Sequence, residues 1–337
     1  MAIAVVESKI GGADAATTSK TVTFTSPGQP ASGNIWAAFG AVRADSATKA
    51  INTPSGMTQR SVNTVSGQFG ILFKDLVSDG TNGVNTTLTQ TASTPMGLFA
   101  LNLSGVNTAT APITGNANSG ATAQDGITVT AESAVATDGS LAIAVIFRSG
   151  TLQGGTPITR NYGTGWSELT YVADFASPAG EVEIYVATKT VNIADGTVSC
   201  VFNPSGTNAV HAGFIAIYAP AAAVAPTVTM DSPPGDVEIY EGDSLVLNGS
   251  ATGGTTPYKN WLWTIPEEGS GVADQTVEDP GPVAFPNAGT WTLTLTVDGN
   301  DDLTSSPVTI TVTVLVAVSS TVSPWQVPNR RRRRRKG

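Results

Sequence analysis

The sequence has almost none of the residues from which active sites are commonly built. Among 337 residues there is one histidine, His211, and one cysteine, Cys200. A Ser-His-Asp or Cys-His arrangement would have to use His211, and zinc sites of the usual ligand sets need more such residues. Cys200 lies in the alternating pattern Thr197–Phe202, where a cysteine behaves as a small apolar residue. We therefore expect both residues to be structural, and the protein to be neither an enzyme nor a cofactor-binding protein.

Long hydrophobic runs are also missing. The first seven residues hold an apolar run of five residues with no basic region before it, which is too short for a signal peptide. No stretch approaches the roughly 18 apolar residues of a membrane span. We therefore expect synthesis in the cytoplasm without a signal peptide, and no membrane partner.

Charge is scarce and unevenly placed. Only 13% of residues are charged, with a formal net charge of −9. Seven of the 17 basic residues form one run, so the preceding chain has 10 basic and 26 acidic residues and a charge of −16. Thirteen of the acids lie between Asp231 and Asp302, where Lys259 is the only base. An acidic body with a basic tip does not form one nucleic-acid-binding surface.

Glycine and proline, by contrast, are abundant, with 36 and 20 residues. Short runs of Val, Thr and Ile alternate with Asp-Gly and Asn-Gly turn signals, for example Asp79-Gly80 and Asp138-Gly139. Continuous apolar runs such as Leu141–Phe147 are typical of strands that are buried on both faces. No window supports a long amphipathic helix. The pattern predicts an all-β protein.

The first 220 residues contain a diverged internal repeat. Gly33–Val42 resembles Gly139–Phe147 at a displacement of 106 residues, and Ser55–Met57 resembles Thr164–Trp166 at 109. Gly67–Phe73 aligns with Gly180–Val186 at 113, and Gly97–Leu101 aligns with Gly213–Ile217 at 116. The displacement grows between these blocks, as it does when loops change length and strands stay in register. We therefore predict two jelly-roll-like β-sandwich modules, residues 1–115 and 116–220.

These two halves resemble tandem β modules of tailed-bacteriophage virion and tail-associated proteins. That family's pattern includes a Pro-x-Gly-Trp/Met-Thr turn, a strand ending near Tyr-x-Lys, and a closing Tyr-x-Gly-Val followed by Pro-Ile. The matching segments here are Thr53–Thr58, Leu72–Lys74, Leu103–Val106 and Ala111–Ile113. The second half keeps Thr164–Ser167 and loses most of the rest. The resemblance covers roughly residues 20–220 and carries no catalytic residue.

A third module follows the Ala/Pro-rich segment Ala219–Pro226, which reads as a linker. Residues 226–316 resemble a polycystic-kidney-disease (PKD) repeat, an immunoglobulin-like β-sandwich, through the segments Gly242–Leu247, Gly253–Tyr258, Phe285–Val297 and Val308–Val314. The resemblance implies that Trp263 is the large central core residue. The family's usual Trp-Asp-Phe-Gly-Asp-Gly turn is replaced here by Trp263–Gly269. Residues 317–337 form a tail.

Carboxylates offer two weak candidate sites. Glu181 and Glu183 share a strand face, as a glycosidase pair can, but we interpret them as a solvated face. Oxygen ligands at loop ends suit Ca²⁺, and a calcium site is a hypothesis for one end of the third module. Its candidate ligands are Glu241, Asp243, Asp298, Asp301 and Asp302.

The basic run is the sharpest local signal. It consists of Arg330, Arg331, Arg332, Arg333, Arg334, Arg335 and Lys336. Seven adjacent cations bind polyanions, including DNA, by counterion release. They equally suit an acidic protein surface, including this protein's own acidic modules, or a solvated tail.

Together these features favour a non-enzymatic virion structural protein of a tailed phage. We expect a capsid decoration or head-fibre protein that stabilises the particle or mediates weak surface attachment. The expected partners are capsid or tail proteins of the same virion, further copies of the chain and host-surface glycans, with nucleic acid bound only through the basic run. A phage tail or fibre component, and a bacterial surface adhesin or carbohydrate-binding module, are the alternatives.

Overall fold

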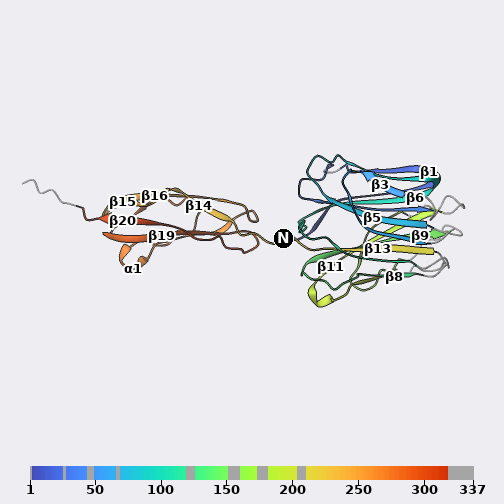
Figure 1. Ribbon diagram of the computed structural model, residues 1–337. Helices are drawn as coiled ribbons and strands as arrows, with labels where there is room; N and C mark the ends of the chain where they lie inside the picture. The colour runs from blue at the N-terminus through green and yellow to red at the C-terminus, as the bar shows by residue number, and fades with distance from the viewer. Residues whose placement is uncertain are drawn as a thin grey trace, which may run out of the picture. The chain divides into compact units, whose positions relative to one another are not determined.

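The computed structural model describes residues 2–25, 28–43, 49–65, 69–118, 126–150, 160–172, 181–202 and 210–317. These residues lie mainly in strands, with one 3₁₀ turn (η1, Ile193–Asp195) and one four-residue helix (α1, Glu267–Ser270). The predicted all-β class, built from β-sandwiches, is confirmed. In the described part of the chain, no helix is long and apolar enough to cross a membrane. The chain divides into two compact units, residues 1–222 and 223–337 (Figure 1).

The first half of unit 1 forms a sheet with the strand order β1-β6-β2-β5-β4, in which β3 also pairs with β6. The strands are β1 (Ala4–Thr23), β2 (Ile35–Arg43), β3 (Lys49–Thr53), β4 (Thr58–Val65), β5 (Phe69–Val77) and β6 (Asn85–Ser104). The two 20-residue strands, β1 and β6, pair along most of their length and are interrupted by register shifts. Such irregularities bend a strand.

The second half forms a sheet with the order β10-β11-β9-β13-β7 and a separate pair, β12-β8. The strands are β7 (Ile113–Asn118), β8 (Ile127–Thr130), β9 (Ser140–Gly150), β10 (Ser167–Val172), β11 (Glu181–Val191), β12 (Ser199–Phe202) and β13 (Val210–Tyr218). Read from its other edge, this order is that of the first half, with β7, β13, β9, β11 and β10 in the places of β1, β6, β2, β5 and β4.

The register of the two sheets matches as closely as their order. Thr58 pairs with Asp75 in the first half, and Ser167 pairs with Thr188 in the second, at displacements of 109 and 113 residues. The register shift between Gln59 and Ser61 in β4 recurs between Glu168 and Thr170 in β10. A bulge is a specific local feature rather than a defect. Its recurrence at the equivalent position shows that the two halves correspond strand by strand.

The last block of the sequence alignment is wrong by one residue. Phe39 pairs with Phe99 and Val145 pairs with Phe214, so β6 and β13 correspond at a displacement of 115, not 116. Phe99 and Phe214 both face the core between the sheets. Aligning Gly97 with Gly213 superposes two glycines, but their missing side chains point to opposite faces. In a strand, a slip of one residue exchanges the faces of every side chain.

One hydrophobic core joins the two halves of unit 1. Phe39, Phe73 and Phe99 from the first sheet pack with Val145, Ile184 and Phe214 from the second. The rings of Phe39 and Phe73 are stacked at 4.3 Å, and Phe214 lies 6.3 Å from Phe39. At the edges, β4 lies over β7 and β1 lies over β10, contacts that exchange places when the two halves are exchanged. The halves therefore pack as an isologous pair within a single chain.

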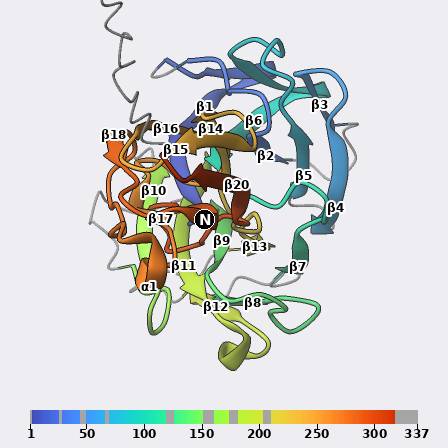
Figure 2. The same cartoon turned by 90° about the vertical axis from the view of Figure 1, so that its left-hand side faces the viewer.

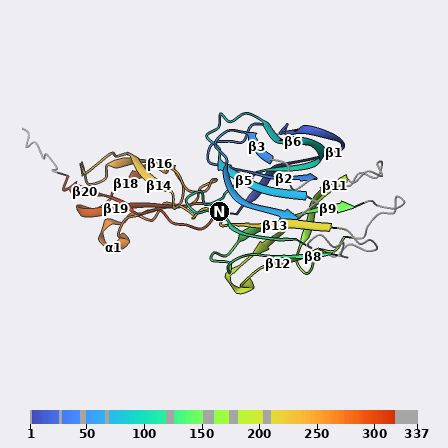
Figure 3. The same cartoon turned by 45° about the vertical axis from the view of Figure 1, so that its right-hand side comes forward.

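Each sheet is also covered on its outer side. Parts of β1, β3 and β6 cover the first sheet over a cluster that includes Phe24, Trp36 and Leu88. The β8–β12 pair covers the second sheet over a cluster that includes Val129, Cys200 and Phe202. Figures 2 and 3 show the resulting layers, with β3 at one side and β8 and β12 at the other. Both central sheets are buried on two faces, as their continuous apolar runs predict.

Unit 2 is an immunoglobulin-like sandwich of two sheets, β14-β16-β18 and β15-β20-β19-β17. The strands are β14 (Thr227–Ser232), β15 (Val237–Tyr240), β16 (Ser244–Thr252), β17 (Lys259–Thr264), β18 (Gly281–Ala284), β19 (Gly289–Asp298) and β20 (Val308–Leu315). Trp263 is fully buried in its core beside Leu247 and Leu295. The Trp263 indole N–H donates to the carbonyl of Val277 at 3.0 Å, which satisfies its polar end.

Candidate functional site

The single histidine and the single cysteine both lie inside unit 1. His211 on β13 is completely buried, and its ring lies edge-on to Phe202 with 5.8 Å between the ring centroids. The Cys200 thiol is also completely buried and lies 3.6 Å from the carbonyl oxygen of Tyr162. Burial raises the pKa of Cys200 to about 12, so the thiol stays protonated at neutral pH.

A buried ion pair lies on the same face of the second sheet. Arg148 on β9 donates from Nη1 to Oε2 of Glu183 on β11 at 2.7 Å, and both side chains are 1% exposed. The Tyr185 hydroxyl donates to the same carboxylate oxygen at 2.7 Å. Burial is the main cause that raises the pKa of Tyr185, and the adjacent Glu183 carboxylate adds to it. The interpretation of Glu183 as part of a solvated face is therefore wrong, because β8 and β12 cover that face.

The ion pair belongs to the second half alone. Arg148 lies between Glu183 and His211 in the sheet, whereas the corresponding residue Val42 lies between Gly70 and Met96. The first half thus has apolar residues where the second half has charge. The signal in the sequence was an arginine directly after the apolar run Leu141–Phe147, facing a glutamate in the aligned strand, but only the register pairs the two.

A second polar group connects the two sheets. Asp75 on β5 is 1% exposed and accepts hydrogen bonds from Arg60 Nε at 2.5 Å and from the Tyr218 hydroxyl at 3.1 Å. Tyr218 is on β13, so the bond joins residues 143 positions apart. Desolvation raises the pKa of Asp75, although Arg60 and Tyr218 oppose the shift. This group closes one side of the shared core.

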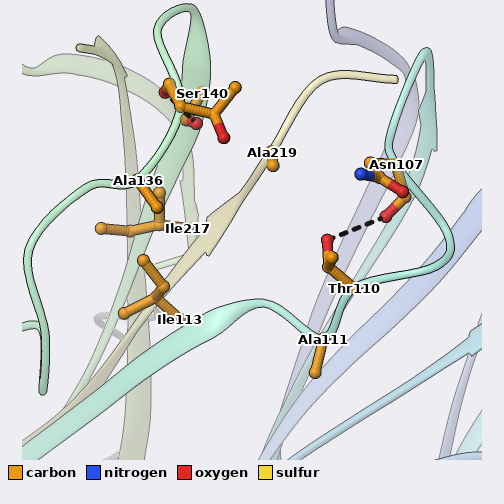
Figure 4. A pocket seen from close by; sticks show the side chains of 9 residues that line it. Asn107, Thr110, Ala111, Ile113, Ala136, Ser140, Ile217 and Ala219 are labelled. Atoms are coloured by element: carbon orange, nitrogen blue, oxygen red, sulfur yellow. Dashed lines mark hydrogen bonds between the residues drawn. The ribbon is translucent and has the colours of Figure 1, made fainter. Parts of the chain in front are cut away.

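A pocket with a volume of about 140 Å³ lies in unit 1 (Figure 4). Its wall is apolar where Ile113, Ala136 and Ile217 meet, and polar groups of Asn107, Thr110, Thr137 and Ser140 line the rest. The Ser140 hydroxyl donates to the Thr137 carbonyl at 2.6 Å, and the Thr110 hydroxyl donates to that of Asn107 at 3.5 Å. These hydroxyls are engaged locally, and the pocket contains no charged group.

The proposed calcium ligands are not brought together. Glu241 and Asp243 follow β15, where the Glu241 amide bonds to the Leu315 carbonyl at the end of β20. Asp298, Asp301 and Asp302 follow β19, next to the start of β20. The two groups lie at opposite ends of the sandwich, separated by the ten residues of β19, or about 30 Å of strand. Among the residues that the structure describes, no group of three or more His, Cys, Asp or Glu side chains is arranged to hold a metal ion.

The second group of these carboxylates already has protein partners. Asp298 accepts hydrogen bonds from Thr304 at 2.6 Å and from Asn260 at 2.9 Å, and the Thr304 bond is the main cause that lowers its pKa. Asp301 accepts from Thr255 at 2.9 Å, and Asp302 lies 2.8 Å from Lys259. These contacts hold the β19–β20 loop in place.

The opposite end of unit 2 presents an exposed apolar patch beside carboxylates. Tyr240 is 52% exposed, Leu315 is 37% exposed and Val316 is 67% exposed, and Tyr240 pairs with Leu315. Glu238 shares the outer face of this sheet with Tyr240, because Val237 and Ile239 point into the core. We call Glu238, Tyr240, Glu241, Leu315 and Val316 the β15 edge patch. The predicted basic run, Arg330–Lys336, lies outside the described residues.

Comparisons with known proteins assign neither a family nor a role to this chain. No protein-family model matches the chain, and no curated protein matches it. Fibronectin(III)-like modules of Clostridium thermocellum CbhA align at 14% identity over 60% of this chain and 94% of theirs, with a TM-score of 0.24. The Ig1–Ig3 ectodomain of mouse nectin-like molecule 4 aligns at 14% identity over 86% of this chain and 97% of its own, with a TM-score of 0.21. Neither likeness carries information about a site.

Proposed function

We propose that this chain is a non-enzymatic structural protein of a tailed-phage virion, which decorates the capsid or forms a head fibre. The supporting observation is the construction of unit 1. Its two halves bury one shared core and are covered on both outer sides, and the single histidine and cysteine are packed inside it. Such a body is suited to bear load and to present surfaces.

The sequence resemblance of residues 20–220 to phage virion modules supplies the virion part of the proposal. The immunoglobulin-like unit 2 suits a projecting module, with weak attachment to surface glycans as its role. Further copies of the chain and capsid proteins are the proposed partners. A capsid role is preferred to a tail role.

Electron microscopy of particles from the source culture tests this function directly. Gold-labelled antibodies against unit 2 are expected to decorate phage heads, and mass spectrometry of gradient-purified particles is expected to find the chain. Antibodies against a cytosolic host protein are the control. Label on tails would transfer the role to a tail or fibre component. Absence from particles together with label on the cell surface would replace the proposal with an adhesin.

A further inference from the structure

We propose that the basic segment Arg330–Lys336 docks on the β15 edge patch of its own chain. Charge complementarity points to this basic segment as the occupant of the patch. Between Asp231 and Asp302, unit 2 has 13 acidic residues, and Lys259 is the only base. Opposite potentials steer association and fix where a charged segment rests. This inference does not depend on the virion role.

The position of the patch favours this occupant over others. The chain described by the structure ends at Ala317, directly after Val316, which is itself part of the patch. Twelve residues, 318–329, connect that point to Arg330. A short covalent connection raises the effective concentration of a tethered segment, to the millimolar range at its highest. The tethered segment therefore meets this patch before any segment of another molecule does.

The patch also offers both kinds of contact that the segment needs. Glu238 and Glu241 are exposed, and Asp243 beside them accepts a hydrogen bond from the Tyr240 amide at 2.9 Å. Arginine guanidinium groups form bidentate hydrogen bonds with carboxylates and stack on aromatic rings. Tyr240 supplies such a ring. The exposed side chains of Leu315 and Val316 suit the apolar Trp325 within the connection.

Docking has a consequence for polyanions. Seven cations held on the carboxylates of unit 2 are withheld from DNA, which binds such runs by counterion release. A polyanion must therefore displace the segment from the patch, and weakening the patch strengthens binding to a polyanion.

The contact can be measured with a spin label in the full-length protein. The variant Asn329→Cys places a label beside the basic segment, and Cys200 stays unlabelled because it is buried. We expect loss of the amide signals of Glu238–Asp243 and Thr313–Val316 at about 0.02 M salt, and their return at about 1 M salt, where screening acts within about 3 Å. Changing Arg330–Lys336 to glutamine keeps the tether and is expected to restore the signals.

Matched charge variants locate the contact. Glu238→Gln combined with Glu241→Gln is expected to restore the signals. Asp274→Asn combined with Glu278→Gln makes the same charge change beyond the opposite sheet edge, where Gln275 pairs with Trp263 of β17, and is expected to leave them lost. Equal effects of the two double variants, or signal loss that survives the glutamine segment, would overturn the proposal.

Two further measurements complete the test. In a mixture of spin-labelled chains with isotope-labelled, spin-free chains, the signals of the latter are expected to persist; their loss would make a second copy the occupant and refute docking within one chain. A DNA duplex is expected to bind Glu238→Gln/Glu241→Gln more tightly than Asp274→Asn/Glu278→Gln at low salt. Equal DNA affinities would contradict the competition.

Discussion

At the scale of single residues, the ion pairs of unit 1 differ strongly in burial. Arg148 and Glu183 have 1% exposure each, whereas Lys189 and Asp195 form a pair with 24% and 30% exposure. A buried charge that loses its partner keeps its full desolvation cost, while an exposed one is hydrated by water. Two ion pairs within the same half should therefore behave very differently.

Arg148→Met is expected to destabilise unit 1 by about 3–5 kcal/mol, because it leaves the Glu183 carboxylate buried without its cation. Lys189→Met, the control, is expected to cost less than about 1 kcal/mol. Urea unfolding followed by circular dichroism measures both. The double variant Arg148→Met/Glu183→Leu should recover part of the loss, and a double variant that is less stable than Arg148→Met would contradict this account.

Asp75 makes stability depend on pH in a defined direction. Burial raises its pKa in the folded protein above the ordinary 3.8, so between these two values the folded state holds more protons than the unfolded state. Its contribution to stability is therefore present below pH 3.8 and is lost as pH rises through the folded pKa. Relative to the wild type, Asp75→Asn is expected to gain stability from about pH 3 to about pH 7. Melting temperatures across that range measure the difference, and a constant difference would refute it.

At the scale of elements, the register of the strands determines which side chains share a face of the sheet. The repeat in the sequence located the strands of both halves, but its last block matched glycine to glycine and slipped by one residue. Local similarity did not distinguish the two faces of β13, because that strand is apolar on both. Pairing with β9 distinguishes them. Glycines in this fold accordingly have different roles at aligned positions.

Gly115 shows what such a glycine does. A Cβ on Gly115 would overlap the carbonyl oxygen of Thr130 and lie 2.9 Å from the Cα of Ala131, where backbone does not yield. A Cβ on Gly40 would meet only the terminal methyl groups of the Leu88 side chain, the nearer at 2.9 Å, and a methyl group shifts more easily than backbone does. Gly115→Ala is expected to cost at least about 3 kcal/mol and Gly40→Ala about 1 kcal/mol. Thermal unfolding compares the two, and an equal loss would contradict the backbone contact.

At the scale of the whole molecule, cooperativity should follow the cores. The first half and the second half of unit 1 share one core, whereas unit 2 has a core of its own. We expect two unfolding transitions in calorimetry. Leu101→Ala in the first half and Ile184→Ala in the second should each reduce the free energy of unfolding of unit 1 by about 2–5 kcal/mol. Both should therefore lower the melting temperature of the same transition. Leu295→Ala, in the core of unit 2, should lower only the melting temperature of the other transition.

Three transitions, or a shift of separate transitions by Leu101→Ala and Ile184→Ala, would show that the halves of unit 1 unfold independently.

The sequence by itself determined the all-β class and the positions of most strands. The resemblance to a PKD repeat implied the central place of Trp263, which is fully buried. Alternating and continuous apolar patterns are local properties, and turns rich in glycine and asparagine separate them, so these features are readable without a partner strand. Because histidine and cysteine are scarce, we expected His211 and Cys200 to be structural residues, and both side chains are fully buried.

Only the tertiary structure decided which faces are covered and which side chains meet. Glu183 is buried because β8 and β12 fold over its face, and the five candidate calcium ligands are apart because β15 and β19 end at opposite ends of the sandwich. Asp75 meets Tyr218 across 143 residues of chain. These contacts depend on long-range register and sheet packing, and neither is encoded in a local pattern.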